Sequence, residues 1–158
     1  MTTITPLARA DHDDWRTLWG GYLAFYETTV DEHITAGTFE RLVTPGGDLR
    51  GAIARDADGT AVGFVHWLTH PATWTDTSYC YLEDLFVSDA ARGAGVGRGL
   101  IAHVRERAEQ AGATKVYWLT AETNTAARAL YDRVGTLSGM VHYEIRLGDA
   151  ERDPGSGA

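Results

Sequence analysis

The stretch Arg92-Gly-Ala-Gly-Val-Gly-Arg-Gly99 sets glycines at alternate positions between a predicted strand, Tyr79 to Val87, and a predicted helix. The helix is indicated by apolar residues at three- and four-residue spacing, among them Leu100, Val104 and Ala108. Backbone N–H groups and the positive end of the helix dipole bind anions at a helix N-terminus, and glycine lets a phosphate approach the backbone. The stretch therefore predicts a phosphate-binding loop, with an ordinary turn before a helix as the alternative.

Two other glycine-rich loops fit this stretch less well. A Walker P-loop is excluded because no Gly-Lys-Ser/Thr follows. The looser dinucleotide-binding pattern is met by Gly97, Gly99 and Ala102, and Glu122 lies near the place of a ribose-binding acid. However, Ser88 to Arg92 separate the strand from the glycines, and too little chain follows for a full doubly wound sheet. An oxidoreductase of that kind is therefore a minor alternative.

The elements predicted outward from the loop alternate in a mixed α/β order. Strands are predicted over Thr3 to Leu7, Leu49 to Arg55, Thr60 to His70, Tyr79 to Val87, Lys115 to Thr120 and Val141 to Leu147. Helices are predicted from Trp15 to Tyr26, from Thr35 to Val43, after the glycines, and from Asn124 to Val134. Within the first helix, Gly20-Gly21 marks either a kink or a close approach of another group to the backbone.

Composition limits the class of protein. The 158 residues suit one domain over residues 1–147, and residues 148–158 are predicted to be a flexible tail. The formal charge of -8 argues against a nucleic-acid binder with a basic face, and no apolar run approaches the roughly 20 residues that span a membrane. Cys80 is the only cysteine, which excludes an intrachain disulfide, and no leader sequence is evident. We therefore expect a cytoplasmic protein.

Three motifs together resemble a known family. Arg92-Gly-Ala-Gly-Val-Gly97 matches the Arg/Gln-x-x-Gly-x-Gly/Ala signature of the GNAT N-acetyltransferase superfamily. It is preceded by Tyr81-Leu-Glu-Asp-Leu-Phe-Val87 and followed by Asn124-Thr-Ala-Ala-Arg-Ala-Leu-Tyr131, all within Val62 to Tyr143. The resemblance implies an α/β (α+β) fold with helices flanking a mixed, mostly antiparallel sheet. That sheet would be splayed between its two central strands, with acetyl-coenzyme A in the opening.

The resemblance also implies which residues hold acetyl-coenzyme A. Backbone groups at the end of the central strand, Leu85, Phe86 and Val87, would pair with the pantetheine arm. The pyrophosphate would be held by the loop and the helix start, which comprise Arg92, Gly93, Ala94, Gly95, Val96, Gly97 and Arg98. Asn124 and Ala127 would flank the lower pantetheine. No metal is expected, because His66 and His70 share a strand face with no third ligand evident.

N-acetylation needs a base, because an alkyl ammonium with a pKa near ~10 must lose a proton before it attacks. Glu83 and Asp84 are neighbours on a strand and should point to opposite faces, so one of them faces the opening. Diamine and polyamine acetyltransferases resemble this Leu-Glu-Asp segment and use its glutamate, which makes Glu83 the candidate base, directly or through water. Tyr131 matches the family's usual general acid. The alternatives are a merely solvated or ion-paired carboxylate and a core tyrosine.

The first helices, which wall the acceptor site in the resembled family, are acidic. Residues 1–40 carry Asp11, Asp13, Asp14, Glu27, Asp31, Glu32 and Glu40 against only Arg9 and Arg16. A cationic acceptor would be attracted there, although ordinary surface charge is the alternative. Leu23-Ala-x-Tyr-Glu27 resembles the acceptor-contacting segment of diamine acetyltransferases, so Tyr26 and Glu27 are candidate acceptor residues.

Aromatic residues crowd the central strands and can line the site of a cationic chain. They are Trp67, Trp74, Tyr79, Tyr81, Tyr117 and Trp118, of which Trp118 is the candidate acceptor contact. The runs His66-Trp-Leu-Thr-His70 and Val116-Tyr-Trp-Leu-Thr120 resemble a GNAT subgroup of histone, other-protein and D-amino-acid acetyltransferases. That subgroup takes both protein and small-molecule acceptors, so the resemblance defines the chemistry better than the substrate.

The resemblance implies an N-acetyltransferase that moves the acetyl group of acetyl-coenzyme A to a primary amine in a ternary complex. The expected acceptor is a small cationic molecule such as a polyamine, diamine or amino acid, and a protein lysine or N-terminus is the alternative. A non-catalytic acyl-coenzyme-A-binding regulator is a second alternative, against which the presence of Glu83, Asn124 and Tyr131 argues. Family members commonly pair through late strands, so we expect a homodimer in which His142 to Arg146 meets a partner chain.

Overall fold

A computed structural model describes residues 1–147 and shows two compact units. The first is Met1–Trp118 and the second begins at Leu119. The single domain predicted over residues 1–147 stays a prediction, and the predicted tail, residues 148–158, lies outside the described residues. Within residues 1–147, no helix combines the length and the apolar character that crossing a membrane requires.

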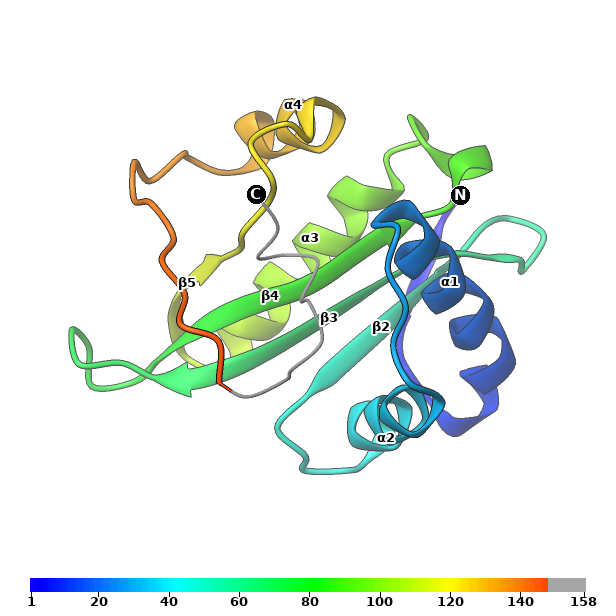
Figure 1. The fold of residues 1–158 in the computed structure, drawn as a ribbon, viewed down its shortest axis with the longest axis horizontal. Helices are drawn as coiled ribbons and strands as arrows, with labels where there is room; N and C mark the ends of the chain where they lie inside the picture. The colour runs from blue at the N-terminus through cyan, green and yellow to red at the C-terminus, as the bar shows by residue number, and fades with distance from the viewer. Residues whose placement is uncertain (148–158) are drawn as a thin grey trace. The chain divides into compact units, whose positions relative to one another are not determined.

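The first unit is built on a five-stranded sheet with the strand order β1-β2-β3-β4-β5 (Figure 1). The strands are β1 (Thr3–Pro6), β2 (Arg50–Arg55), β3 (Ala61–Pro71), β4 (Ser78–Val87) and β5 (Ala113–Tyr117). Neighbours from β1 to β4 are antiparallel, and β5 is parallel to β4. The structure therefore confirms the predicted mixed, mostly antiparallel sheet.

Helices cover both faces of this sheet (Figure 1). The helices α1 (His12–Phe25) and α2 (Glu32–Val43) lie on one face, and α3 (Val96–Gln110) lies on the other. Short 3-10 turns, η1 (Arg9–Asp11) and η2 (Asp89–Ala91), precede α1 and the glycine loop. The α3 stripe predicted from the sequence is the buried one, because helical spacing brings its members to one side. Its buried residues are Val96, Leu100, Ile101, Val104 and Ala108.

The sheet opens between β4 and β5. The described pairing of these strands runs from Ser78 opposite Ala113 to Tyr81 opposite Tyr117. On its other side, β4 stays paired with β3 as far as Val87. The C-terminal half of β4 therefore has a ladder on one edge only, which is the predicted splay between the two central strands.

The second unit contains α4 (Thr125–Val134), close to the predicted helix from Asn124. The strand predicted over Val141 to Leu147 is wrong, because residues 136–147 form no regular element. The prediction relied on alternating apolar residues, and Val141, Tyr143, Ile145 and Leu147 are 74%, 87%, 88% and 82% exposed. A strand persists only when it is paired and its apolar face is covered, and no described strand pairs with this segment.

Candidate active site

A β-bulge on β4 carries the candidate base. The register pairs His66 with Asp84 and Trp67 with Leu82, so Glu83 is the extra residue on β4. The prediction that Glu83 and Asp84 lie on opposite faces assumed regular alternation, which the bulge interrupts. Asp84 shares a face with His66, and Leu82 shares the opposite face with Trp67. The Glu83 side chain is exposed, as a base that meets a substrate from solvent requires.

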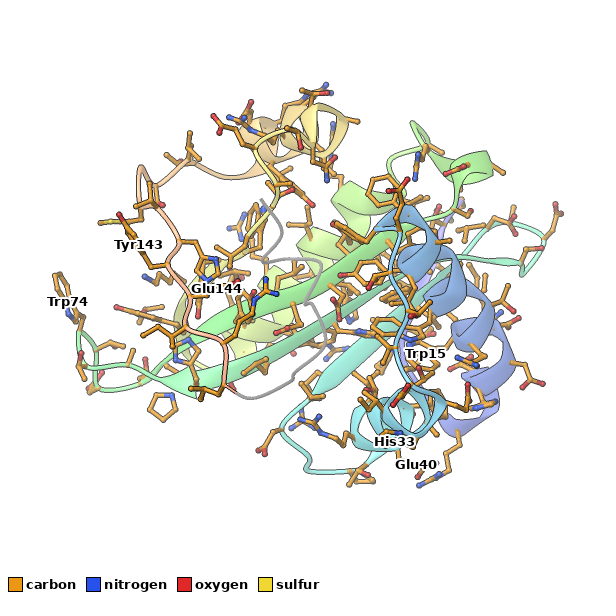
Figure 2. All side chains as sticks on the ribbon, viewed as in Figure 1. Trp15, His33, Glu40, Trp74, Tyr143 and Glu144 are labelled. Atoms are coloured by element: carbon orange, nitrogen blue, oxygen red, sulfur yellow. The ribbon has the colours of Figure 1, made fainter. Side chains whose placement is uncertain are left out.

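Asp84 is held by protein partners. The Tyr22 hydroxyl of α1 donates to Oδ1 of Asp84 at 2.6 Å, and Nδ1 of His66 lies 2.9 Å from Oδ2. His66 is itself buried, and its Nε2 accepts from Nε1 of Trp15 at 2.9 Å. Figure 2 shows Trp15 between α1 and the sheet. The carboxylate thus links helix α1 to the strand that carries Glu83.

An aromatic pair lies at the point where β4 and β5 part. The rings of Tyr81 and Tyr117 are stacked, with centroids 5.0 Å apart. The pKa of Tyr117 is raised by burial and by the negative charge of Glu83, so the two side chains are within electrostatic range. The Tyr117 hydroxyl lies 2.8 Å from Nε2 of His70, whose Nδ1 donates to the Pro71 carbonyl. The phenol therefore donates to His70 and stays protonated at neutral pH.

The predicted aromatic wall is smaller than the sequence suggested. Trp74 is 91% exposed at the tip of the loop between β3 and β4, where it points away from the sheet (Figure 2). Trp67 is buried, and its ring meets His103 of α3 on the opposite face from His66. Strand alternation separates Trp67 from the face of Tyr81 and Tyr117. Trp118, the last residue of the first unit, is half-buried.

The end of β4 supplies the expected backbone edge. Leu85, Phe86 and Val87 pair with Val65, Phe64 and Gly63 of β3, and all three residues of β4 are half-buried. In an antiparallel pair, alternate residues turn their N–H and C=O groups away from the partner strand. Because the β5 ladder ends at Tyr81, those groups face the opening. An extended ligand arm can therefore add to this edge as a further strand would.

The glycine loop ends in a turn that only glycine adopts easily. Gly93 and Gly95 have φ values of 78° and 83°, and Gly95 is the N-cap of α3. An added Cβ at either glycine would meet no atom within 4 Å, so the space above the loop is open. The first bond of the helix runs from the N–H of Gly99 to the carbonyl of Gly95 at 3.0 Å. The N–H groups between these glycines therefore have no intrahelical acceptor and suit a pyrophosphate.

Arg92 joins the loop to the end of α1. Its guanidinium lies 2.8 Å from Asp89 and 5.3 Å from the centre of the Phe25 ring. Arg98, in the first turn of α3, is exposed. The two arginines flank the glycine loop in sequence, and their positive charges would add to the attraction of a phosphate.

Gly21 explains the glycine pair in α1. An added Cβ at Gly21 would lie 2.9 Å from Cζ of Phe86, whereas one at Gly20 would meet nothing within 4 Å. The helix continues through both glycines to Phe25. Of the two expectations for this pair, the close approach is confirmed, and it brings α1 against the end of β4.

Tyr26 and Glu27 lie where α1 ends. The N–H of Thr28 donates to Leu23 and that of Glu27 donates to Ala24, both at 3.1 Å, which is the Schellman pattern. Glu27 occupies the left-handed position of this motif with a φ of 52°, and no other non-glycine residue within 1–147 has a positive φ. Such strain concentrates at functional positions, which singles out Glu27. The ring of Tyr26 packs on that of Tyr22, with centroids 5.0 Å apart.

Glu27 also differs from the other acidic residues of the first helices. Every other Asp and Glu within residues 1–40 has a basic side chain within ion-pair distance. The pairs are Asp11 and Asp14 with Arg55, Asp13 with His12, Asp31 with His33, Glu32 with Arg16, and Glu40 with Arg9. Within the described chain, Glu27 has no such partner, so its charge is available to a ligand.

The second unit holds the remaining candidates. Asn124 caps α4, with its Oδ1 accepting from the N–H of Ala127 at 3.4 Å and its Nδ2 donating to Thr120 Oγ1 at 3.3 Å. Tyr131 lies on the same helix and is half-buried. The predicted roles of Asn124, Ala127 and Tyr131 beside the coenzyme stay predictions.

Sequence reasoning missed the partners of Asp84 and Tyr117. Tyr22, His66 and Trp15 form one hydrogen-bonded chain, and His70 receives the Tyr117 hydroxyl. A histidine inside an otherwise apolar strand was the available signal for His66, since a buried polar side chain needs a partner. Within residues 1–147, no group of three His, Cys, Asp or Glu side chains is placed to hold a metal.

Comparisons with known proteins agree with this geometry. The Acetyltransferase (GNAT) family profile matches residues 12–136. The D-amino-acid N-acetyltransferase HPA3 of Saccharomyces cerevisiae (strain ATCC 204508 / S288c) is 38% identical over 135 residues, which cover 85% of this chain and 84% of that protein. The chain therefore belongs to the GNAT family of acetyltransferases. It is an acetyl-coenzyme-A-dependent N-acetyltransferase.

Solved structures share the fold. The ribosomal-protein-alanine N-acetyltransferase of Brucella melitensis biovar Abortus 2308 superposes with a TM-score of 0.73 at 22% identity, covering 93% of this chain and 100% of that one. The enzyme AAC(6')-Iy, in complex with the bisubstrate analogue CoA-S-monomethyl-acetylneamine, superposes with a TM-score of 0.78 at 22% identity, covering 93% and 99%. A probable acetyltransferase superposes with a TM-score of 0.83 at 18% identity, covering 94% of this chain and 99% of that one.

Proposed function

We propose that the enzyme acetylates a primary amine of a small cationic molecule by direct attack within a ternary complex. The observation that carries this proposal is the presence of two carboxylates, that of the exposed Glu83 on the β4 bulge and that of Glu27 at the end of α1. Opposite charge attracts an ammonium group, and two such groups suit an acceptor with a second cation. Polyamines and diamines are of this kind.

Glu83 acts as the base in this proposal, directly or through water. An alkyl ammonium has a pKa near ~10 and must lose a proton before its nitrogen can attack the thioester carbonyl. Glu83 is exposed, so a water molecule can stand between its carboxylate and the amine. The new C–N bond displaces the coenzyme A thiolate, to which the Tyr131 hydroxyl donates a proton.

Acetyl-coenzyme A is proposed to lie along β4 and across the glycine loop. The backbone edge formed by Leu85, Phe86 and Val87 would pair with the pantetheine arm, and a backbone N–H near Leu85 or Phe86 would stabilise the oxyanion. The pyrophosphate would rest on the N–H groups of residues 93–98, with Arg92 beside it. Asn124 and Ala127 would flank the lower pantetheine. The open space above Gly93 and Gly95 supports this placement.

Tyr26, Glu27 and Trp118 are proposed as acceptor contacts. Two named relatives act on, or are bound to, small amines: HPA3 is a D-amino-acid N-acetyltransferase, and AAC(6')-Iy was solved with a coenzyme A–acetylneamine conjugate. A protein N-terminus is the second candidate, since the Brucella neighbour is a ribosomal-protein-alanine N-acetyltransferase.

We also propose a homodimer formed through the segment around His142 to Arg146. Val141, Tyr143, Ile145 and Leu147 alternate along this segment and expose large apolar side chains. A second copy would cover them and supply a strand partner, which no strand within residues 1–147 does. Light scattering of purified protein tests this proposal, and a monomer at micromolar concentration would contradict it.

A screen of thiol release from acetyl-coenzyme A tests the proposed acceptor class. Diamines, polyamines, D- and L-amino acids, aminoglycosides and amino-terminal peptides would each be offered at equal concentration. We expect the highest kcat/KM with an acceptor that carries two or more cationic groups. A clear preference for peptides would favour the protein acceptor, and a preference for amino acids without a second cation would contradict the role of Glu27.

A further inference from the structure

A buried chain of hydrogen bonds ends one residue from the candidate base. Nε1 of Trp15 donates to Nε2 of His66 at 2.9 Å, and Nδ1 of His66 lies 2.9 Å from Oδ2 of Asp84. The Tyr22 hydroxyl donates to the other oxygen of Asp84 at 2.6 Å. Trp15, His66 and Tyr22 are 0%, 2% and 4% exposed, so water competes little for these bonds.

The direction of each hydrogen bond in this series follows from the chemistry of the side chains. An indole N–H only donates, so Nε2 of His66 must accept from Trp15. A neutral imidazole that accepts at Nε2 carries its proton on Nδ1, and that proton points at Asp84. Asp84 as a carboxylate then accepts from His66 on one oxygen and from Tyr22 on the other. Helix α1, through Tyr22, and strand β3, through His66, therefore both hold the Asp84 side chain.

Because of the bulge, the position of Glu83 depends on the hydrogen bonds that hold Asp84. Regular pairing with β3 is interrupted at Glu83, so the ladder alone does not determine where this residue lies. Asp84 follows it directly, and consecutive Cα atoms are about 3.8 Å apart, so a shift of Asp84 carries Glu83 with it. Catalytic groups must be held within roughly 0.5 Å of their productive geometry, which a clamped neighbour can ensure.

We propose that His66 is a positioning residue for acetyl transfer: its Nδ1–H holds Asp84 and thereby fixes the bulge that presents Glu83 to the amine. This proposal rests on the proposed role of Glu83 as the base. His66 does not touch the reacting atoms. Loss of the His66 side chain should lower kcat and leave the affinity for acetyl-coenzyme A unchanged. The glycine loop and the outer edge of β4, which are proposed to bind the coenzyme, take no part in these hydrogen bonds.

Two substitutions separate the two hydrogen bonds of His66. In His66→Asn the amide can take the place of Nδ1 and donate to Asp84, but Trp15 loses its acceptor. In His66→Gln the longer side chain reaches the place of Nε2, which serves Trp15 but removes the donor to Asp84. Trp15 is fully buried, whereas the Asp84 side chain is 15% exposed and can take a water molecule. His66→Asn should therefore be the less stable variant.

We expect the kcat values of the two His66 variants to have the opposite order to their stabilities. His66→Gln should lose roughly tenfold or more in kcat, and His66→Asn should stay within about threefold of the wild type. A kcat order that follows the melting temperatures would overturn the proposal and make His66 a structural residue only. Thr35→Val is the matched control, because Thr35 is a buried acceptor for the indole of Trp19 at 3.3 Å, between α1 and α2. It should lower stability without lowering kcat.

A double-mutant cycle with Glu83→Gln tests whether His66 acts through Glu83. We expect His66→Gln to cost less than about threefold in kcat once Glu83 has been replaced. An equal loss in both backgrounds would overturn the role of His66. A fully active Glu83→Gln enzyme would instead overturn the proposed base, which is a separate result. If His66→Asn does not fold, Tyr22→Phe, which removes only the second donor to Asp84, should give the same dependence on Glu83.

Discussion

Gly21 of α1 lies so close to the Phe86 ring of β4 that an added Cβ would stand 2.9 Å from Cζ. Real Cβ atoms do not approach carbon that closely, so a side chain at residue 21 would force either the Phe86 ring or helix α1 to move. Tyr22, the next residue, reaches Asp84 at 2.6 Å. The glycine thus allows the contact through which α1 holds the strand that carries Glu83.

The two glycines of α1 should respond to alanine in opposite ways. Gly20→Ala should stabilise the fold by roughly 1 kcal/mol, because alanine favours the helix and its Cβ meets open space. Gly21→Ala should destabilise it by about 1 to 3 kcal/mol, because the added methyl group displaces Phe86. Urea unfolding measures both changes. Equal effects of the two substitutions would contradict the close packing at Gly21.

Glu27 should combine a stability cost with a function. Glu27→Gly should raise the free energy of unfolding by roughly 1 kcal/mol, because glycine adopts the left-handed conformation without strain. The same change should raise KM severalfold for a diamine and little for a monoamine, because the second ammonium loses its partner. Glu27→Gln is the control, since it keeps the strain and removes the charge. It should share the KM effect without the gain in stability.

The glycine loop should lose its ligand when it gains a negative charge. Gly97→Asp places a carboxylate at the N-terminus of α3, where it favours the helix but repels a pyrophosphate. We expect the Kd for coenzyme A, measured by calorimetry, to rise roughly tenfold or more. Gly97→Ala, which adds no charge, should bind much more tightly than Gly97→Asp. Equal affinity of a folded Gly97→Asp enzyme would remove this loop from the coenzyme site.

Replacement of the proposed base should change the pH dependence of the reaction. Glu83→Gln should lower kcat roughly hundredfold near pH 7. Activity should recover in part towards pH ~9.5, because the amine, with a pKa near ~10, then loses its proton to solvent. Glu109→Gln on the exposed face of α3 is the control and should match the wild type. Wild-type activity of Glu83→Gln at pH 7 would shift the role of base to another group or to solvent.

Cys80 should be inert in the native enzyme. Its side chain is fully buried, and burial raises the pKa of the thiol to about 11. The folded state therefore holds the proton more tightly than the unfolded state. This contribution to stability is complete below the ordinary pKa of 9.0 and is lost as the pH rises through about 11. Alkylation should be slow until denaturant is added, and rapid native alkylation at neutral pH would contradict this burial.

Local pattern was enough to predict most elements of the fold. Helical spacing predicted the α3 stripe, and runs of strand-forming residues predicted β2 and β3, because each pattern depends on residues near one another in sequence. The glycine loop could be predicted in the same way, because the strand, the turn and the helix start that form it are consecutive in sequence. The three ordered motifs then sufficed to predict the GNAT family.

The remaining features of the fold depended on strand pairing and on packing between elements. The bulge at Glu83 exists only relative to β3, so no pattern within β4 could reveal that the alternation from Leu82 to Asp84 is interrupted. The same limit explains the wrong strand at Val141 to Leu147, because alternation supplies an apolar face but no partner edge. Trp15, His66 and Asp84 are far apart in sequence, and only the packing of α1 on the sheet brings their donors and acceptors together. Sequence by itself determined the local elements and the chemistry they can carry, whereas tertiary contacts decided how the candidate base is held.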